Sequence, residues 1–257
     1  MVAKIIAVAS TKGGVGKTTI ALQLAINRAL RGGDVWLVDG DRQKTSMMAL
    51  ALRDQQGAVP GIACASYPDG KLLRSQVRLQ RDKWDYIVID VGGFDSTTLR
   101  ASLSICDALV VPYQPRSFDI WGLSQMSNLV HEAFEMRDEF PVYALLNSAD
   151  AAHTADNQDA QDAVSEFPEM KLLPCALGRR KAFATASGFG LSVSELKTKD
   201  RKAISEINEL LDAVFGKDEP LQKECAVSES EDISSDFKND AQKEATGDIS
   251  KEPKQEE

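Results

Sequence analysis

The segment from Ser10 to Thr19 reads STKGGVGKTT, and it lies between an apolar run at residues 5–9 and a helix-forming run at residues 20–30. Glycines have no Cβ atom, so successive backbone N–H groups can turn inward around phosphate oxygens. The helix that follows directs the positive end of its dipole at a bound anion. The segment therefore predicts a phosphate-binding loop between a strand and a helix, and the remainder of the chain is interpreted around it.

Three kinds of residue divide the work expected of this loop. Gly13, Gly14 and Gly16 form the cradle, so that main-chain groups hold most of a nucleotide. Lys17 is expected to reach the β- and γ-phosphates, and the Thr18 hydroxyl is expected to ligate Mg²⁺. Because eight consecutive residues fit this pattern, we favour it over the alternative of a chance turn rich in glycine and lysine.

The loop departs from the ordinary P-loop pattern G-x-x-x-x-G-K-[ST] at one position. Thr11 stands where that pattern has its first glycine, and a second lysine, Lys12, follows it. The resulting K-G-G-x-G-K-T-T box resembles the deviant Walker A box of the ParA/MinD family of dimerising ATPases. In that family the corresponding lysine crosses to the phosphates of the partner subunit. The resemblance implies ATP and Mg²⁺ as cofactors and a homodimer in the ATP-bound state.

The same resemblance assigns residues to the ATP site. Asn147 ends a later apolar run, where relatives use a polar side chain to contact the adenine edge; a strand-ending turn is the alternative reading. The expected catalytic residues are Lys12, Lys17 and Asp41. The expected ATP-binding residues are Lys12, Gly13, Gly14, Val15, Gly16, Lys17, Thr18, Thr19 and Asn147.

Two carboxylates follow the second apolar run of the chain. The segment from Asp39 to Ser46 reads DGDRQKTS. It resembles the D-x-D-P-Q box of the same family, with Arg42 in place of the proline, and in that box the second aspartate, here Asp41, positions the attacking water. A carboxylate here can also hold Mg²⁺-bound water, so Asp39 is expected as a metal residue. From the residues alone, a turn followed by a helix cap is the alternative.

A third carboxylate, Asp90, ends the apolar run in W-D-Y-I-V-I-D. This segment resembles a Walker B strand, whose aspartate holds Mg²⁺ through water. The expected metal residues are therefore Thr18, Asp39 and Asp90. Gly92 and Gly93 follow, and they permit a loop that moves with the γ-phosphate.

Short apolar runs alternate with helical patterns along the chain. This alternation predicts an α/β fold, a P-loop NTPase with a mainly parallel twisted sheet flanked by helices on both faces. The ligand should then lie at the carboxyl ends of the strands. Phe118 and Trp121, in the helix after the fifth strand, are expected to pack in the core. Strands are expected at residues 3–9, 35–38, 62–65, 86–89, 108–111, 142–146 and 172–175, and a final helix from about residue 199 to residue 215.

Charge divides the chain of 257 residues into two expected parts. The net charge is −9, but residues 217–257 hold 6 Lys against 13 Asp and Glu, which leaves only −2 for residues 1–216. We expect a ParA-like ATPase domain at 1–216 and an acidic disordered tail at 217–257, because the tail has too few apolar residues to order itself. Cys64, Cys106, Cys175 and Cys225 are widely scattered, and we expect reduced thiols rather than a metal or redox site.

Basic residues concentrate near the end of the expected domain. Duplex DNA attracts such clusters through counterion release whatever its sequence, although a solvated helix face explains any single one of them equally well. A dimer would double the cluster, so we expect non-specific DNA binding. The candidate residues are Arg179, Arg180, Lys181, Lys197, Lys199, Arg201 and Lys202.

The resemblance is to small ParA proteins that lack an N-terminal helix-turn-helix domain. It implies an ATP-driven switch for plasmid or chromosome partition, in which a cargo-bound ParB-like activator stimulates hydrolysis. Carboxysomes or conjugation machinery are alternative cargoes, and a P-loop metabolic enzyme is the alternative class. An iron-sulfur reductase would need cysteines facing a dimer partner. A membrane positioner would end in a basic amphipathic helix, which the acidic end does not offer. We expect a cytoplasmic, nucleoid-associated protein with no membrane partner.

Overall fold

The computed structural model describes residues 2–115, 117–150 and 155–217, except for the side chains of residues 117–120. In this part of the chain a parallel sheet has the strand order β3-β2-β4-β1-β5-β6-β7, and β8 pairs with β6. The strands are β1 (Lys4–Val8), β2 (Val35–Asp39), β3 (Ala63–Ser66), β4 (Tyr86–Asp90), β5 (Ala108–Tyr113), β6 (Val142–Ala149), β7 (Met170–Leu172) and β8 (Leu177–Gly178). The predicted α/β fold is confirmed.

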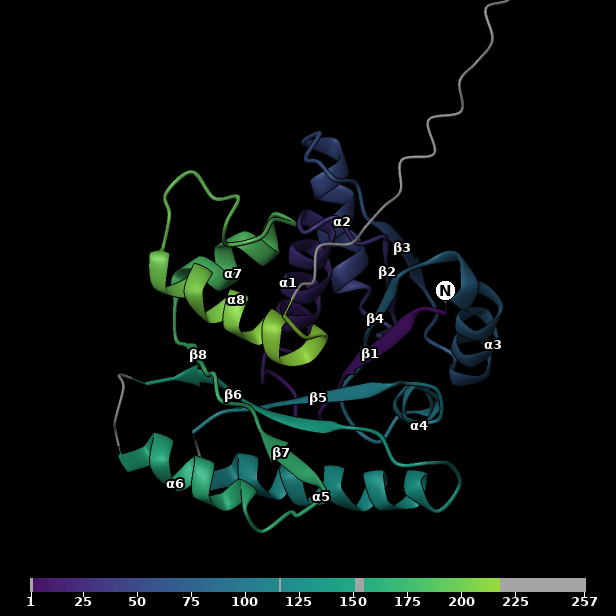
Figure 1. The fold of residues 1–257 in the computed structure, drawn as a ribbon, viewed down its shortest axis with the longest axis vertical. Coiled ribbons are helices and arrows are strands. Elements are labelled where there is room, and N and C mark those ends of the chain that lie inside the picture. The colour runs from purple at the N-terminus through teal and green to yellow at the C-terminus, as the bar shows by residue number, and fades with distance from the viewer. Residues whose placement is uncertain (1, 116, 151–154, 218–257) are drawn as a thin grey trace, which may run out of the picture. The chain divides into compact units, whose positions relative to one another are not determined.

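Helices cover both faces of the sheet (Figure 1). One apolar cluster joins the sheet to α3, α4, α5 and α6, and a second joins it to α1, α2, α7 and α8. The helices are α1 (Lys17–Leu30), α2 (Thr45–Gln55), α3 (Gly70–Gln80), α4 (Thr97–Leu103), α5 (Ser117–Phe134), α6 (Ala155–Val164), α7 (Lys181–Gly188) and α8 (Arg201–Phe215), with a 3₁₀ turn, η1 (Arg81–Lys83), after α3.

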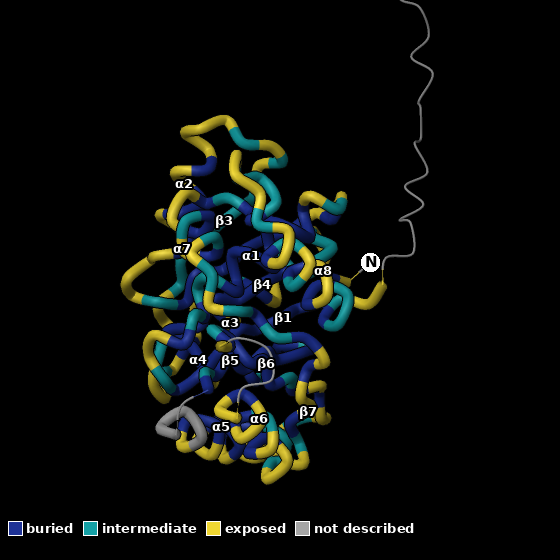
Figure 2. The backbone as a smooth tube through the Cα atoms, turned by 90° about the vertical axis from the view of Figure 1, so that its left-hand side faces the viewer, coloured by how far each residue is buried: buried dark blue, intermediate teal, exposed yellow. Residues whose placement is uncertain are grey.

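The strands are continuous apolar runs because both of their faces are covered. In β1, Ile5 and Ala7 point into one cluster, while Ile6 and Val8 point into the other. Figure 2 shows the central strands β1, β4 and β5 buried and the exposed residues on the outer sides of the helices and loops. None of the helices in the described residues is long and apolar enough to cross a bilayer.

The last helix begins at Arg201, close to the expected start near residue 199, because the Asp200 side chain accepts hydrogen bonds from the N–H groups of Lys202 and Ala203 and caps it. Two expectations about individual elements are wrong. The strand expected at 172–175 does not form: β7 ends at Leu172 and β8 begins at Leu177, and Pro174 between them has no N–H to donate to a neighbouring strand. Trp121 is 67% exposed and does not pack in the core.

The exposure of Trp121 follows from the face that α5 turns to the sheet. Leu123, Met126 and Val130 are buried in the apolar cluster, and Trp121 lies outside that stripe. The side chain of Phe118 lies outside the described residues. So does the expected acidic tail from residue 218 onward.

Candidate functional site

Parallel pairing brings the expected site residues to one edge of the sheet. Val8 at the end of β1 is in register with Asp90 at the end of β4, and Asp90 is in register with Asp39 at the end of β2. The loop from Ser10 to Gly16 leaves the end of β1 at the same edge and leads directly into α1. The glycine-rich loop and two of the three carboxylates therefore meet where ligands of such sheets bind.

The loop has the backbone shape that its glycines were expected to allow. Gly14 and Gly16 adopt φ angles of 77° and 95°, which other residues rarely adopt, and Gly16 precedes the first turn of α1. Gly13 and Gly14 are exposed, and a Cβ added at either would meet no atom within 4 Å. The loop lines a cavity of about 480 Å³ together with Lys17, Asp41 and Gly93 among others. This volume lies within the usual range for a small-molecule site.

Lys17 places a buried cation at the floor of this cavity. The residue is 8% exposed, and its Nζ donates a hydrogen bond of 2.8 Å to the main-chain oxygen of Lys12. Burial lowers the pKa of Lys17, while the negative charges of Asp90 and Asp41 oppose that shift. A phosphate oxygen is a stronger acceptor for an ammonium group than a carbonyl oxygen is. A bound phosphate can therefore replace the Lys12 carbonyl as the hydrogen-bond acceptor of Lys17.

Asp39 and Asp90 are both buried, but only Asp39 is satisfied by the protein. The carboxylate of Asp39 accepts hydrogen bonds of 3.0 Å from the N–H groups of Asp41 and Met47, which fixes the start of the following segment. Asp90 is 1% exposed, and neither of its carboxylate oxygens has a hydrogen-bond partner. The hydroxyl of Ser46 is also buried without one.

Burial and the negative charge of Asp39 raise the pKa of Asp90 to about 7. The nearby hydroxyl groups of Thr18 and Ser46 and the positive charge of Lys17 favour the ionised carboxylate and limit this rise. A buried carboxylate without a partner calls for a cation or its bound water, and its oxygen chemistry fits Mg²⁺. In the described residues no three His, Cys, Asp or Glu side chains gather closely enough to hold a metal alone.

Asp41 lies at the mouth of the cavity beside the loop that follows β4. Its Oδ1 accepts a hydrogen bond of 2.9 Å from the N–H of Gln43. A Cβ added at Gly92 would lie 3.4 Å from Asp41 Oδ2, and one added at Gly93 would lie 3.6 Å from Lys17 Nζ. The two glycines therefore allow the backbone to approach both functional side chains closely.

The next residue, Phe94, was not singled out by the sequence. It adopts a φ of 68°, a strained angle for a bulky side chain, and is 77% exposed at the rim of the cavity. Its N–H donates a hydrogen bond of 3.2 Å to the oxygen of Thr11, which ties the loop after β4 to the phosphate loop.

Two contacts join the phosphate loop to α5 and β6, one made by Lys12 of the loop and the other made by Asn147. The aliphatic part of Lys12 lies against the start of α5, where a Cβ added at Gly122 would be 2.7 Å from Lys12 Cγ. Asn147 Nδ2 donates a hydrogen bond of 2.7 Å to Val15 O and lies directly beside Gly16. Both residues thus lie at the phosphate loop; the adenine contact expected of Asn147 stays a prediction, and its hydrogen bond to Val15 is a contact that the sequence did not reveal.

A further brace comes from Gln114, whose Nε2 donates a hydrogen bond of 3.1 Å to Gly14 O. No local sequence pattern predicts these two contacts, because Gln114 is 100 residues from Gly14 and Asn147 is 132 residues from Val15. Both follow from the sheet order, which places the ends of β5 and β6 next to the loop.

The basic cluster divides into two groups. Arg180 donates two hydrogen bonds to Glu206 Oε1, one of 2.6 Å from Nη2 and one of 3.0 Å from Nε. Nη2 of Arg179 lies 3.8 Å from Oδ1 of Asp150. Lys199 donates a hydrogen bond to the oxygen of Ser194. Five side chains are exposed and form no ion pair with the described residues: Lys181, Lys197, Lys199, Arg201 and Lys202.

The cysteines of the described part belong to the core. Cys106 and Cys175 are buried and Cys64 is half-buried. Burial raises the pKa of Cys64 and Cys106 to about 12 and that of Cys175 to about 11, so these three thiols stay protonated. They do not present thiolate ligands to a partner subunit.

A glycine cradle at a helix N-terminus, a buried lysine and buried carboxylates at the carboxyl edge of a parallel sheet define a P-loop nucleotide-binding protein. The family model "CobQ/CobB/MinD/ParA nucleotide binding domain" matches residues 6–216. The chain belongs to this family, as the K-G-G-x-G-K-T-T box predicted.

Three similar proteins illustrate the family. The "Maintenance of carboxysome distribution protein A" of Halothiobacillus neapolitanus is 26% identical over 213 residues, which cover 82% of this chain and 95% of that protein. The structure of a Cyanothece McdA–ATP complex covers 86% of this chain and 99% of its own, with a TM-score of 0.71 and 16% identity. A putative plasmid partition protein from Borrelia burgdorferi, bound to AMPPNP, covers 83% of this chain and 98% of its own, with a TM-score of 0.66 and 18% identity.

Proposed function

We propose that this chain hydrolyses ATP with Mg²⁺ as cofactor and acts as an ATP-dependent homodimer that positions or segregates a cargo. One observation carries the proposal: Lys17 and Asp41 line one glycine-lined cavity, and the buried, unpartnered Asp90 lies near enough behind that lining for its charge to act on Lys17. These are the cation, the metal carboxylate and the water-orienting carboxylate that phosphoryl transfer to water requires.

In the proposed mechanism Gly13, Gly14 and Gly16 present backbone N–H groups to the phosphates, and Lys17 exchanges its bond to the Lys12 oxygen for one to a phosphate oxygen. Thr18 and Asp90 would hold Mg²⁺, and Asp39 adds a second buried negative charge beside Asp90. Bound Mg²⁺ supplies charge neutralisation at the β- and γ-phosphates.

Asp41 orients the attacking water, and its place beside Gly92 lets the loop after β4 close on that water. Following the family resemblance, Lys12 reaches the phosphates of the partner subunit. This requires its side chain to leave its present position against Gly122.

We further propose that the ATP-bound dimer binds DNA without sequence preference. The support is the group of five exposed basic side chains near the start of α7 and α8, while Arg180 is engaged by Glu206 and contributes less. The net charge of −9 does not oppose this, because at ordinary salt a surface field reflects charges within about 10 Å. Such a protein would be found in the cytoplasm, at the nucleoid.

The cargo is proposed as plasmid or chromosomal DNA, moved with the help of a ParB-like activator. The similarity to a carboxysome distribution protein supports carboxysomes as an alternative cargo, and conjugation machinery is another. A P-loop metabolic enzyme of the same family remains the alternative class, and it would turn over a small-molecule substrate together with ATP.

The test is ATP hydrolysis by the purified chain, measured as phosphate release with and without Mg²⁺, followed by DNA gel shifts with ATP and ADP. Lys17→Ala should abolish nucleotide binding, because it removes the only buried cation of the described cavity lining. Asp41→Ala should retain ATP binding and slow hydrolysis by about 100-fold or more, since water orientation is lost. Unchanged single-turnover hydrolysis in Asp41→Ala would show that Asp41 has another role.

A further inference from the structure

Helices α3, α4 and α5 enclose a groove of about 290 Å³ that shares no lining residue with the nucleotide cavity. The groove exists because α4 has 7 residues and lies between two longer helices of 11 and 18 residues. Arg74 and Arg78 of α3, Arg100 of α4 and Arg137 just beyond α5 form its rim. We call this the arginine groove.

The four arginines differ in how the fold uses them. Arg137 Nη1 donates hydrogen bonds of 3.2 and 2.9 Å to the oxygens of Leu103 and Cys106 at the end of α4, which fixes its position. Arg74 and Arg78 are exposed, stand one turn apart on α3, and have no ion-pair partner among the described residues. Two guanidinium groups are therefore available to carboxylates from outside the fold.

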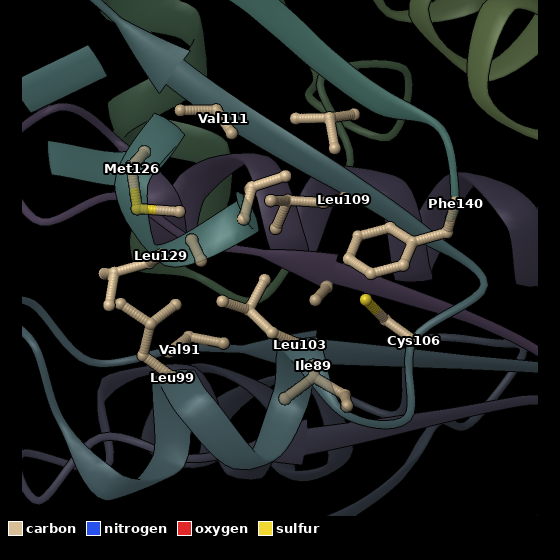
Figure 3. Close-up of a cluster of buried hydrophobic side chains, with 14 of the residues drawn as sticks. Ile89, Val91, Leu99, Leu103, Cys106, Leu109, Val111, Met126, Leu129 and Phe140 are labelled. Carbon is tan, nitrogen blue, oxygen red and sulfur yellow. The ribbon is translucent and has the colours of Figure 1, made fainter. Parts of the chain in front are cut away.

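The groove also has an apolar floor. Leu103 and Leu129 are 2% and 7% exposed, and Figure 3 shows both in the apolar cluster beneath, with Leu103 on α4 and Leu129 on α5. Met136, which lines the groove, is 84% exposed. A flexible methionine over an apolar floor suits an inserted apolar side chain.

We propose that the arginine groove binds an acidic helical peptide segment of a partner protein. Arg74 and Arg78 have the i, i+4 spacing, so two carboxylates at the same spacing on the partner helix face them together. One apolar side chain between the acidic residues enters over Leu103 and Leu129. Duplex DNA fits less well, because Glu132 on the rim repels phosphates and the apolar floor offers them nothing.

The groove is connected to the loop at the nucleotide cavity through Arg100. Its Nε and Nη2 each lie 2.7 Å from an oxygen of Asp95, and its Nη1 bonds to Glu132. Asp95 ends the segment that starts with Gly92 and Gly93, the residues beside Asp41 and Lys17. Arg100 thus joins the wall of the groove to the loop that flanks the proposed water-orienting carboxylate.

This ion pair can exchange partners. The side chains of Arg100 and Asp95 are 49% and 51% exposed, so water screens their attraction and can solvate either partner. A third peptide carboxylate, beyond the two that face Arg74 and Arg78, can therefore replace Asp95 at Arg100 and release the loop. The regulation of hydrolysis that follows rests on the proposed ATPase function, whereas peptide binding does not.

Binding is tested with nucleotide-free protein and a set of fluorescein-labelled helical peptides of about twelve residues. Each has two glutamates at i, i+4 for Arg74 and Arg78, one varied apolar residue between them and a third glutamate one turn further on for Arg100. A set with lysines in place of the glutamates and a duplex DNA are the comparison probes. We expect anisotropy to show binding of at least one acidic peptide that weakens at high salt. Arg74→Glu combined with Arg78→Glu should reduce that affinity at least about tenfold.

The matched control is Lys171→Glu combined with Lys217→Glu, which changes the charge equally at exposed sites outside the groove. This control should bind the acidic peptides like the wild type, and circular dichroism should show all variants folded. Failure of every acidic peptide, or equal loss in both double variants, overturns the proposal. Duplex DNA that binds and is lost only in the Arg74/Arg78 variant overturns it in favour of a nucleic-acid site.

Regulation is tested by adding the bound peptide to the ATPase assay. The peptide should change the ATPase rate of the wild type at least about threefold. The Arg100→Gln variant should still bind the peptide, but its ATPase rate should be the same with and without it. A rate response that persists in Arg100→Gln refutes the connection through Arg100. Absence of hydrolysis in any condition would refute the proposed function instead, and the nucleotide-free binding result would still stand.

Discussion

Replacing Asn147 by alanine separates two roles for this residue, an adenine contact and a brace for the phosphate loop. The substitution removes the 2.7 Å hydrogen bond to Val15 O and the atoms that lie beside Gly16. Loss of one partner leaves the carbonyl of a buried residue unsatisfied, which costs about 1–3 kcal/mol. If the loop keeps its shape only when nucleotide is bound, this cost appears in affinity, as a weakening of roughly 5- to 150-fold.

Isothermal titration with ATP, GTP and inorganic triphosphate gives the decisive comparison. A brace acts on the phosphate cradle, so Asn147→Ala should weaken all three ligands by a similar factor. An adenine contact should weaken ATP alone. The control is Asn128→Ala, an exposed position on α5 that should change nothing. Unchanged affinity for inorganic triphosphate in Asn147→Ala would refute the brace.

Four other variants have clear expected outcomes. Lys12→Ala should still bind ATP as a monomer but fail to dimerise, as measured by light scattering with ATP; normal dimerisation would contradict the role taken from the deviant box. Lys199→Ala, Arg201→Ala and Lys202→Ala together should weaken DNA binding for all sequences and flatten its salt dependence, while deletion of residues 217–257 should leave binding equal or tighter. In EDTA, the free energy of unfolding of Asp90→Asn should rise relative to that of the wild type as the pH increases from about 5 to 8. The wild type loses stability over this range because the pKa of Asp90 is raised in the folded state, so the unfolded state releases the proton at lower pH. A difference in urea unfolding that does not depend on pH would exclude this effect.

The sheet could be predicted because its strands are covered on both faces. A strand such as β4, with Ile87, Val88 and Ile89 all fully buried, must be a continuous apolar run, and the polar residue at its end then marks the ligand edge. The same reasoning fails where the run is short or interrupted. In the apolar stretch after Lys171, β7 ends at Leu172 just before Pro174, so the strand expected at 172–175 does not form; hydrophobic periodicity alone takes no account of the missing N–H of proline.

Contacts between distant segments were beyond sequence reasoning. The hydrogen bonds of Asn147 and Gln114 to the phosphate loop depend on the sheet order, and that order cannot be read from the strands one by one. The pairing of Arg180 with Glu206 likewise removed one residue from the basic cluster, although its charge and position looked suitable. The arginine groove needs three helices at once, so no single stretch of sequence indicates it.

The cluster around Asp90 shows why a functional site can be less stable than the fold around it. A pKa raised from 3.8 to about 7 corresponds to a destabilisation on the order of 4 kcal/mol above pH 7, because the folded chain holds a charge that water would solvate better. Hydrogen bonds to Asp90 would remove most of that cost, yet Ser46 beside it is also unpartnered. A bound cation would offset the same cost only when present, which couples Mg²⁺ binding to the stability of the strand end. The unsatisfied carboxylate is therefore preorganised for a cation, and filling its place with protein donors would make the fold more stable and the site inactive.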